Sequence, residues 1–544
     1  MKIFKLGIIV KDNNVFSWQQ KIIEKLINSL NIEILILKTQ MVWPIQNNLK
    51  VPSLYHFYDR LDRTLFKQKI NYLNIVDSIS FLNGIPNITF NSIEIYYADD
   101  GTKSVYRQIA HYNLDLILNF STLSCEKYFV NVSKYGILSY RLDGENKENE
   151  YPACYWEIVK ETTEIGASAI LTDNFGKESA VSRVSLSTYP NSVHINRDQI
   201  SKLGPLIISR IIFGLKGSGQ SFLQKSIETT NREKQLKKKT LERYPNSIEV
   251  MYNSVVLLKR FLIKNMLYKE LGRWSVQYKF NCSTNYNTEF SSFTRLKCRN
   301  GAFLADPFVI SKDDKSFIFL EEYDYKKDKG RISVISVDDA GNQSSIHSII
   351  DNSYHMSYPF IFELDKTYYL MPETSSTKSI ELYKCLEFPN KWEFCLNIME
   401  NVNAKDSTLF YYDQKWWLFT SMNETGFNEL NFNELFLFYT DDIFSSKWQS
   451  HPKNPIVNDP KLSRPAGKVF INEGKIYRPS QDCSGTYGNA ININQITKLN
   501  EKEYMENLVS KIRPDWDHNL AGLHTLNFDK NITLIDVLQP RRKF

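Results

Sequence analysis

Five polar side chains in the second half of the chain recur at intervals of about 50 to 60 residues, a spacing typical of repeat architectures. Each opens a short phrase that ends in a hydrophobic, strand-like run, and the five are Asp306, Ser357, Asp406, Arg464 and His524. Carboxylates, an imidazole and a guanidinium are suited to proton transfer and to binding hydroxylated or anionic ligands. The alternative interpretation is local, because Asp and Pro are common turn residues where a strand begins.

The repeat predicts the elements that position these side chains. Each copy consists of a turn-prone group, a first strand and a second strand, as in Ala305–Ile310 followed by Phe317–Leu320. Five such copies predict a five-bladed β-propeller over residues 273–544. In a propeller the innermost strand of every blade runs beside the axis, so the five opening residues are predicted to share one axial site. Trp392 and Trp448 are predicted to pack between blades.

Seven more side chains are predicted to lie near this axial site. They are Glu322, His355, Glu373, Arg478, Gln481, Asp482 and Tyr487. Glu373 and Glu322 each end the second strand of a blade and are the candidates for a proton-donating acid. His355 and His524 have three open interpretations: general base, metal ligand, or hydrogen-bonded core residue. No cysteine spacing typical of a zinc site occurs, and no metal site is predicted.

The first 215 residues alternate between strand-like and helix-like patches. Leu6–Val10, Ile32–Leu37 and Leu114–Phe120 have the apolar runs of buried strands, and Trp18–Leu30 has helical spacing. This alternation predicts an α/β, Rossmann-like domain over residues 1–215, with a parallel sheet covered by helices. The first strand–helix turn, Lys11–Val15, lacks the GxGxxG pattern, so a tightly bound NAD is not expected.

Residues 216–272 are predicted to form a helical connector. Gly214–Gly219 has the composition of a hinge, and the run from Arg232 to Arg243 is strongly charged. Residues 248–271 are helical and rich in apolar side chains. Two interpretations of this helix stay open: it docks the two domains, or it lies on an anionic membrane surface.

Composition excludes several functional classes. The net charge of the 544 residues is +6 on 128 formal charges, which gives no reason to predict nucleic-acid binding. The seven cysteines are scattered and odd in number, so no disulfide framework is predicted. The apolar N-terminal run is too short for a signal peptide, and no run of about 18 apolar residues occurs. We therefore expect a cytoplasmic protein, with membrane association through residues 248–271 as the alternative. The oligomeric state is not predicted.

Residues 1 to about 190 resemble the N-terminal domain of the formyltransferases related to methionyl-tRNA formyltransferase. The segments that carry the resemblance are Leu114–Phe120, Tyr135–Arg141 and Thr163–Asp173. That family has Asn and His where this chain has Ser139 and Arg141, and its catalytic Asp falls near Lys177. Because arginine cannot accept a proton, the resemblance implies the fold but neither formyl transfer nor a folate cofactor. Arg141 and Lys177 are either anion-binding residues, for a ligand such as a sugar phosphate, or ordinary surface charges.

Residues 274–544 resemble the propeller domain at the N-terminus of the glucosamine inositolphosphorylceramide transferases. The matching phrases are Ala305–Phe308, Glu321–Tyr323, Ser357–Phe360, Met371–Thr374, Arg464–Gly467, Tyr477–Cys483, Tyr487–Gly488 and His524–Thr525. In that family the glycosyltransferase is a separate C-terminal module. The resemblance therefore implies the fold and says little about the chemistry.

The same half is more distantly similar to the family 43 glycoside hydrolases. Those five-bladed propellers use an Asp base, a second Asp that tunes its pKa, and a Glu acid. The resemblance implies that Asp306 and Asp406 occupy the two Asp positions, whereas the fourth blade offers Arg464 in place of the Glu. A guanidinium favours phosphate or carboxylate binding and is expected to lower the pKa of neighbouring acids.

These observations predict a carbohydrate-active transferase, or a subunit of one, that acts on an activated or phosphorylated sugar in surface polysaccharide or glycolipid biosynthesis. The candidate catalytic residues are Asp306, Asp406, Glu373 and His524, and Arg464 with Arg478 would offset phosphate charge. The first alternative is a glycoside hydrolase with a repositioned acid. The acid would be repositioned because hydrolysis needs a protonated carboxylic acid opposite a carboxylate, and the fourth blade has Arg464 in place of the Glu. The second alternative is a non-catalytic glycan-binding scaffold.

Overall fold

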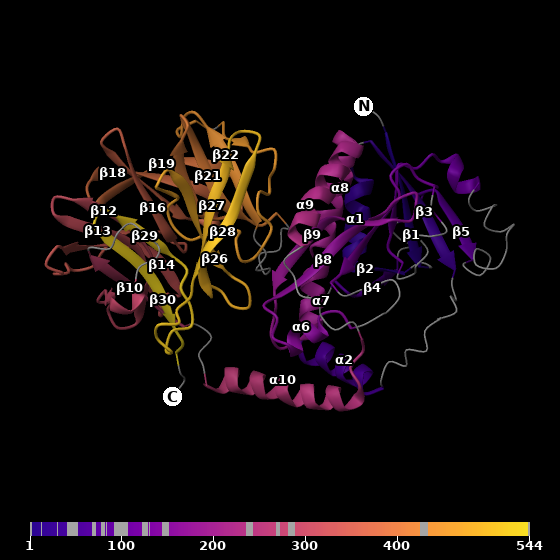
Figure 1. Cartoon of the computed structure of the whole chain (residues 1–544), viewed down its shortest axis with the longest axis horizontal. Helices are drawn as coiled ribbons and strands as arrows, with labels where there is room; N and C mark the ends of the chain where they lie inside the picture. The colour runs from indigo at the N-terminus through magenta and orange to yellow at the C-terminus, as the bar shows by residue number, and fades with distance from the viewer. Residues whose placement is uncertain are drawn as a thin grey trace. The chain divides into compact units, whose positions relative to one another are not determined.

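The computed structural model consists of two compact units, Met1–Arg260 and Phe261–Phe544 (Figure 1). It describes residues 3–11, 14–29, 31–40, 53–67, 72–77, 82, 84–91, 107–121, 129, 131–143, 152–234, 243–267, 272–280, 289–424, 434–445 and 447–541. Each unit has its own hydrophobic core, and each is described by itself.

The first unit is built on a nine-stranded mixed sheet. Its strands are β1 (Phe4–Lys11), β2 (Asn14–Phe16), β3 (Ile32–Gln40), β4 (Ile75–Asp77), β5 (Asn87–Asn91), β6 (Leu116–Asn119), β7 (Ile137–Leu142), β8 (Glu164–Thr172) and β9 (Glu178–Ser187). The order β5–β3–β1–β6–β7 is parallel throughout, and β8 and β9 extend it as antiparallel strands. Leu6, Ile8 and Ile9 of β1 are fully buried, as expected of a strand covered on both faces. Because the sheet is mixed, the formyltransferase-type, Rossmann-like fold is not confirmed and stays a prediction.

Helices accompany this sheet. They are α1 (Ser17–Ile27), α2 (Ser53–Leu65), α6 (Tyr155–Val159), α7 (Val193–Ser201), α8 (Gly204–Ser218), α9 (Gln220–Lys234) and α10 (Ser247–Leu267). The glycine-rich stretch predicted to be a hinge lies mostly inside α8, which ends at Gly219 with a φ of 58°. Gly214 lies inside α8, and the ring of Phe222 occupies the place that a Cβ would take there. Because glycine has no Cβ, it lets α9 approach α8. No helix among the described residues is long and apolar enough to cross a membrane.

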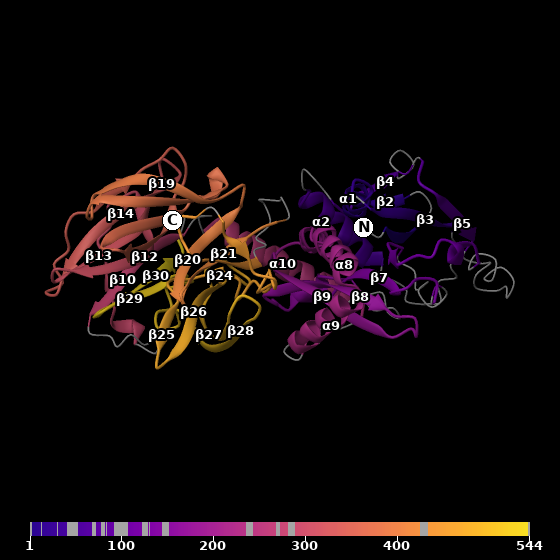
Figure 2. The ribbon, with the colours of Figure 1, turned by 90° about the horizontal axis from the view of Figure 1, so that it is seen from above.

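The second unit is a five-bladed β-propeller, which can be followed from two sides in Figure 1 and Figure 2. The first blade consists of β12 (Ala302–Lys312), β13 (Lys315–Asp324), β14 (Lys329–Asp338) and β15 (His347–Ile350). The second consists of β16 (Ser357–Leu364), β17 (Thr367–Glu373), β18 (Ser379–Glu387) and β19 (Lys391–Glu400). The third consists of β20 (Ala404–Tyr412), β21 (Lys415–Met422), β22 (Glu434–Thr440) and β23 (Gln449–Ser450). The fourth consists of β24 (Arg464–Pro465), β25 (Phe470–Asn472), β26 (Lys475–Asp482), β27 (Ala490–Leu499) and β28 (Tyr504–Ile512). The propeller predicted from the repeat is confirmed.

The fifth blade closes the ring by combining the two ends of the unit. It consists of β10 (Arg273–Phe280), β11 (Thr294–Arg295), β29 (Leu526–Asp529) and β30 (Ile532–Gln539). β10 pairs with β30 over eight residue pairs, from Arg273 with Gln539 to Phe280 with Ile532. This pairing leaves no open edge between the first and last strands, and open edges are prone to aggregation. The innermost strands contact one another in the pairs β12–β16, β16–β20, β20–β24 and β29–β12. The Leu526 amide of β29 donates to the Ala466 carbonyl, which directly follows β24, so the five repeat copies meet at a common axis.

Aromatic side chains fill the spaces between blades. Trp392 of the second blade meets Phe319 of the first edge-on, with ring centroids 5.9 Å apart. Trp448 packs against the same core of buried residues. The prediction that Trp392 and Trp448 serve packing is therefore confirmed.

Candidate functional site

The innermost strands of the first three blades are interrupted at the same place. The register shifts fall at Ala305/Phe308, Ser357/Phe360 and Lys405/Thr408. Within them Asp306, Tyr358 and Asp406 have φ values of 52°, 45° and 50°. Such bulges re-aim side chains and occur beside active sites, and a left-handed backbone at a residue other than glycine costs about 1–3 kcal/mol. Tyr358, rather than the predicted Ser357, is thus the counterpart of the two aspartates.

Asp306 belongs to a fully buried polar group at the axis. Its Oδ1 accepts a hydrogen bond from the Thr525 hydroxyl at 3.0 Å, and its Oδ2 accepts one from the Tyr358 amide at 3.2 Å. Nδ1 of His524 lies 2.6 Å from Oδ2 of Asp536, and Nε2 of His524 lies 3.4 Å from Oδ1 of Asp306. The structure therefore brings His524 to Asp306, as predicted, and adds Asp536 of β30.

The same group offers one ligand atom from each of Asp306, His524 and Asp536, all within 4.8 Å of one another. Two carboxylates and an imidazole are a donor set that suits several divalent metals. Both His524 nitrogens, however, already face carboxylate oxygens, so the hydrogen-bonded core interpretation of His524 accounts for its contacts without a metal.

Asp406 forms a second polar group with residues of three blades. Nε of Arg464 donates to Oδ2 of Asp406, and the Gln481 side-chain amide donates to the same oxygen at 2.8 Å. The Asp406 amide donates to Oε2 of Glu373 at 3.2 Å, and this oxygen lies 3.7 Å from a guanidinium nitrogen of Arg464. The structure thus places Asp406, Glu373, Arg464 and Gln481 together, as predicted. Since two carboxylates face Arg464, its charge is already neutralised within the protein.

An aromatic rim connects the two groups. The guanidinium of Arg464 lies 4.9 Å from the centroid of the Tyr487 ring, and that ring meets His524 edge-on at 5.4 Å. His524 also stacks on Trp274, with centroids 3.9 Å apart and an interplanar angle of 11°. Tyr487 is 43% exposed, so it borders the site from the solvent side, close to where the sequence predicted it.

Glu321 is the acid that sequence reasoning missed. It pairs with Ala305 across β12 and β13, in the position where Glu373 pairs with Ser357 in the next blade. It is 6% exposed, and its Oε1 lies 3.6 Å from Nε2 of His355. The sequence contains a signal for this residue, because Glu321 follows Ala305 by the same number of residues as Glu373 follows Ser357.

Gly330 of β14 makes room for Glu321. A Cβ at this position would meet Oε1 of Glu321 and would lie 2.7 Å from the Met356 carbonyl oxygen. Gly330→Ala is expected to cost about 1–3 kcal/mol of the free energy of unfolding, because the Met356 carbonyl oxygen cannot retreat without moving the backbone and the Glu321 carboxylate would have to leave its place. Gly217→Ala in α8 is the matched control, since nothing lies within 4 Å of its Cβ; it is expected to be neutral or to stabilise by about 0.5–1 kcal/mol. Chemical denaturation of both variants checks this, and equal effects would contradict it.

Burial dominates the electrostatics of the site. It raises the pKa of Asp306 to about 6, with the positive charge of His524 as a partial offset. It likewise raises the pKa of Asp406 to about 6, where Arg464 offsets and Glu373 adds to the effect. The pKa of Glu321 is raised well above its usual range by burial and by the charges of Asp306 and Glu373. Arg464 lowers the pKa of Asp406, as expected, but desolvation of Asp406 outweighs the guanidinium and the net shift is upward.

The pKa of His524 is raised. Burial alone would lower it, but the adjacent charges of Asp536 and Asp306 outweigh burial. The axis therefore combines an imidazole whose pKa is raised by neighbouring carboxylates with two acids whose pKa is raised to about 6, a combination found in sites that transfer protons.

Three predicted axial residues point elsewhere. Glu322 follows Glu321 in β13 and so faces the opposite side of the sheet, where it binds Arg299 at 2.6 Å and Arg331 at 3.0 Å. Arg478 is held by both oxygens of Glu506, at 2.9 and 2.6 Å. Asp482 pairs with Lys511 and accepts from Ser484. His355 reaches the site only through Glu321, and its side chain is 43% exposed.

The two candidates in the first unit, Arg141 and Lys177, are described within that unit. Arg141 of β7 pairs with Glu178 at 3.0 Å. Lys177 is exposed in the turn between β8 and β9, where its amide donates to Asp173. Tyr140 donates its hydroxyl to the Ile200 carbonyl. Anion binding by Arg141 and Lys177 stays a prediction.

The strand pairing and the axial acids together define a five-bladed β-propeller with a buried, acid-rich axial site. Residues 254–519 of this chain match the family model described as glucosamine inositolphosphorylceramide transferase 1, N-terminal. The Oryza sativa subsp. japonica glucosamine inositolphosphorylceramide transferase 1 is 36% identical over 207 residues, 38% of this chain and 27% of that protein. The Arabidopsis thaliana protein of the same name is 31% identical over 264 residues, 48% of this chain and 33% of that protein. The chain thus spans a third or less of the length of these relatives.

Solved glycoside hydrolases overlap weakly with the chain. Zg3597, a family 117 glycoside hydrolase of Zobellia galactanivorans, is 12% identical with a TM-score of 0.33, and covers 49% of this chain and 90% of that chain. The Bacillus subtilis arabinanase Arb43A is 14% identical with a TM-score of 0.30, and covers 43% of this chain and 94% of that chain. The five-bladed fold itself follows from the strand pairing.

Proposed function

We propose that the chain is a transferase of glycolipid biosynthesis, or a subunit of one, and that a sugar binds at the axial site. The observation that carries the proposal is the match of residues 254–519 to the N-terminal region of a glycolipid sugar transferase, in the part of the chain that holds the axial acids. Arg464 is not proposed as the ligand of a donor phosphate, because it is already paired with Asp406 and Glu373.

The axial acids support a role in proton transfer. An acceptor hydroxyl must lose a proton when it attacks a sugar, and a general base works best with a pKa near the working pH. Asp306 and Asp406, whose pKa values are raised to about 6, meet that condition. In this proposal Asp306 or Asp406 accepts the proton, and the Arg464–Gln481 pair holds Asp406 in place.

The proposal is tested by incubating the full chain with UDP-, GDP- and CMP-sugars and with ceramide- or diacylglycerol-based lipid acceptors, and by measuring glycolipid products by mass spectrometry. We expect Asp306→Asn to lower turnover by about 10²–10⁴-fold, the usual contribution of a general base. Asp413→Asn makes the same chemical change in an exposed turn with a similar left-handed backbone, so it should retain wild-type turnover. Unchanged turnover by Asp306→Asn would refute the catalytic assignment.

A second candidate function, glycoside hydrolysis, is favoured by Glu321. Hydrolysis requires a protonated acid beside a carboxylate, and the raised pKa of Glu321 supplies the acid that the fourth blade lacks. Release of reducing sugar from oligosaccharides in the absence of any donor, lost in Glu321→Gln and kept in Asp413→Asn, would favour hydrolysis over transfer. Sugar binding without conversion in either assay would indicate a glycan-binding scaffold.

A further inference from the structure

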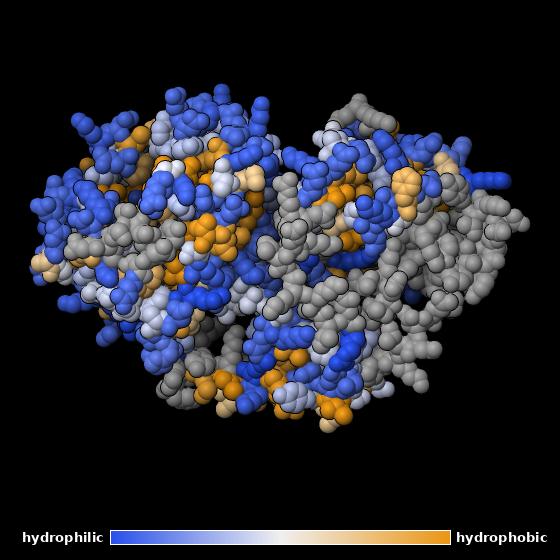
Figure 3. Space-filling model, in the orientation of Figure 1, coloured by the Kyte–Doolittle hydropathy of each residue, from blue (hydrophilic) through white to orange (hydrophobic). Residues whose placement is uncertain are grey.

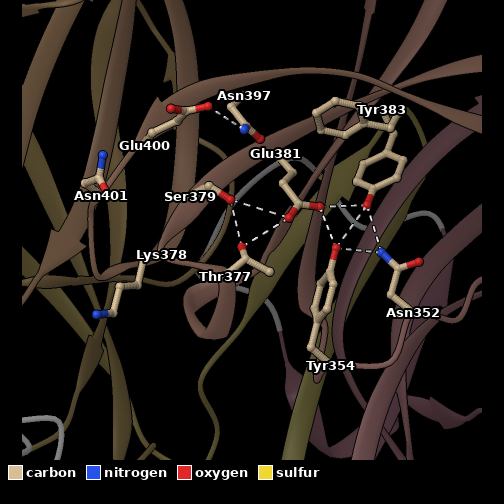
Figure 4. Close-up of a pocket in the computed structure, with 11 residues that line it drawn as sticks. Asn352, Tyr354, Thr377, Lys378, Ser379, Glu381, Tyr383, Asn397, Glu400 and Asn401 are labelled. Atoms are coloured by element: carbon tan, nitrogen blue, oxygen red, sulfur yellow. Dashed lines mark hydrogen bonds between the residues drawn. The ribbon is translucent and has the colours of Figure 1, made fainter.

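A concave site lies on the flank of the second blade, apart from the axial acids (Figure 4). It is formed by β18, β19 and the segment that holds Asn352 and Tyr354, and its cavity volume is about 710 Å³. Its lining includes Tyr354, Glu381, Tyr383, Phe394, Asn397 and Glu400. Small-molecule sites commonly enclose about 300–1,000 Å³, so the cavity is of a suitable size.

Glu381 is the buried centre of this flank pocket. It is 5% exposed, and its Oε2 accepts from the hydroxyls of Tyr354 at 2.8 Å and Tyr383 at 2.7 Å. Its Oε1 accepts from Thr377 at 3.1 Å and Ser379 at 3.4 Å. Among the described residues no cation pairs with Glu381, and Figure 4 shows its carboxylate enclosed by hydroxyl groups. The negative charge is therefore held by neutral donors alone.

This arrangement determines what the pocket wall presents to a ligand. A hydroxyl has one proton, so a hydroxyl that donates to Glu381 can only accept further hydrogen bonds. The Asn352 amide already donates to the Tyr354 and Tyr383 hydroxyls, at 2.7 and 2.9 Å, which leaves each of these oxygens one more lone pair. The lining contains two acids, Glu381 and Glu400, and one base, Lys378. The wall is thus rich in acceptors and carries a net negative charge, which favours ligands with many O–H or N–H donors and disfavours anions.

The pocket also offers an apolar surface. Phe394 is 53% exposed and stands edge-on to Tyr383, with ring centroids 5.9 Å apart. Beside it, the Asn397 amide donates to Glu400 at 2.8 Å, which fixes its orientation. An aromatic ring next to fixed amide and carboxylate groups fits a sugar ring, which has an apolar C–H face and a rim of hydroxyls.

We propose that the flank pocket binds a sugar unit that has hydroxyl or amine donors and no anionic group. The inference rests on the proposed function only for the expectation that the ligand is a carbohydrate. It adds a second sugar-binding site that works without the axial acids.

The test measures binding of three probes to the full chain by ligand-observed NMR: methyl glucoside, methyl glucosaminide and glucose 6-phosphate. We expect the first two to bind, the amine more tightly, and the phosphate not to bind. Phe394→Ala with Asn397→Ala should weaken binding at least tenfold, whereas Leu508→Ala, which is equally exposed on β28, should leave it unchanged.

Asp406→Asn separates this inference from the proposed function. Binding that survives Asp406→Asn but is lost in the Phe394/Asn397 variant supports the flank pocket even if no transfer activity is found. Binding that is lost only in Asp406→Asn, unchanged binding in the Phe394/Asn397 variant, or preferential binding of the phosphate would overturn it.

A second inference concerns α10 and rests on a different observation. Val250, Asn253 and Leu257 form its buried face, and the Asn253 amide donates to the Tyr155 hydroxyl at 3.1 Å. The opposite face carries apolar side chains that are between 44% and 79% exposed and three or four residues apart. They are Ile248, Met251, Tyr252, Val255, Leu258, Leu262 and Met266. Figure 3 shows apolar side chains gathered along this helix.

The charges of α10 indicate what covers this apolar stripe. The helix contains Lys259, Arg260 and Lys264 against a single acid, Glu249. Glu249 pairs with Arg243 and Arg260 pairs with Glu161, so the excess of positive charge in the sequence of the helix comes from the two lysines. Two copies of such a helix would bring like charges together, whereas an anionic lipid surface offers both an apolar layer and opposite charge. Lys259 is exposed at the edge of the stripe, where its long side chain can reach the headgroups.

We propose that α10 binds the surface of an anionic bilayer through this stripe; the inference is independent of the chemistry at the axis. Flotation of the full chain with phosphatidylcholine vesicles and with phosphatidylcholine/phosphatidylglycerol vesicles tests it. We expect binding to the anionic vesicles that falls with added salt and drops at least tenfold in Val255→Glu with Leu262→Glu. Leu386→Glu with Leu508→Glu, exposed to a similar degree on the propeller, is the control. No flotation, equal flotation of both variants, or a dimer without vesicles that only the α10 variant disrupts would overturn the proposal.

Discussion

Arg464→Met is expected to destabilise the propeller by about 3–5 kcal/mol at pH 7.5, the usual cost of removing one partner of a buried ion pair. The side chain of Arg464 is 13% exposed, and those of its partners Asp406 and Glu373 are 2% and 8% exposed. Removing the guanidinium would leave two desolvated carboxylates side by side. Hydrogen exchange of propeller peptides, followed by mass spectrometry in increasing urea, measures the loss within this unit.

Two further variants make the result specific. Asp406→Asn added to Arg464→Met should recover part of the loss, because it removes one of the unpaired charges. Arg513→Met removes an exposed arginine and should change stability by less than about 0.5 kcal/mol. If the double variant were no more stable than Arg464→Met alone, the Arg464–Asp406 pair would not be the origin of the effect.

The contribution of Asp306 to stability should fall by about 3 kcal/mol as the pH rises from about 4 to 7, since its pKa is raised from 3.8 to about 6 and each pKa unit corresponds to 1.36 kcal/mol. Between these pKa values the folded protein binds more protons than the unfolded chain does, so its stability decreases as the pH rises. Above about pH 6 the fold holds a buried ionised carboxylate. Urea denaturation at pH 4.5, 6.0 and 7.5 measures the trend.

Asp306→Asn removes this titration, and it also removes one of the charges that raise the pKa of His524. His524, whose pKa is also raised, contributes stability that is lost over a higher pH range and therefore acts in the same direction. The difference in free energy of unfolding between wild type and Asp306→Asn should shift in favour of the variant as the pH increases. A pH-independent difference would show that Asp306 ionises with an ordinary pKa.

The repeat, and with it the propeller, can be recognised from the order of amino acids alone. Polar turn groups followed by apolar strands recur five times, and the strand-forming stretches at both ends supply the fifth blade. Because the bulged strand places the same position of each copy at the axis, Asp306 and Asp406 were predictable from local pattern alone. The axial residue of the second copy was harder to predict, because the left-handed backbone falls at Tyr358 and not at Ser357.

The other charges that share the site depend on contacts between distant parts of the chain. Glu321 and Glu322 are adjacent, and a sheet sends them to opposite faces, so the choice between them depends on a register that one residue of slip would invert. Arg478 and Asp482 find partners on β28, and Asp536 reaches His524 from the closing strand of the ring. Burial, which raises the pKa of the axial acids despite Arg464, arises from the packing of all five blades. Desolvation depends on how the blades pack together in space, so the order of residue types alone does not predict it.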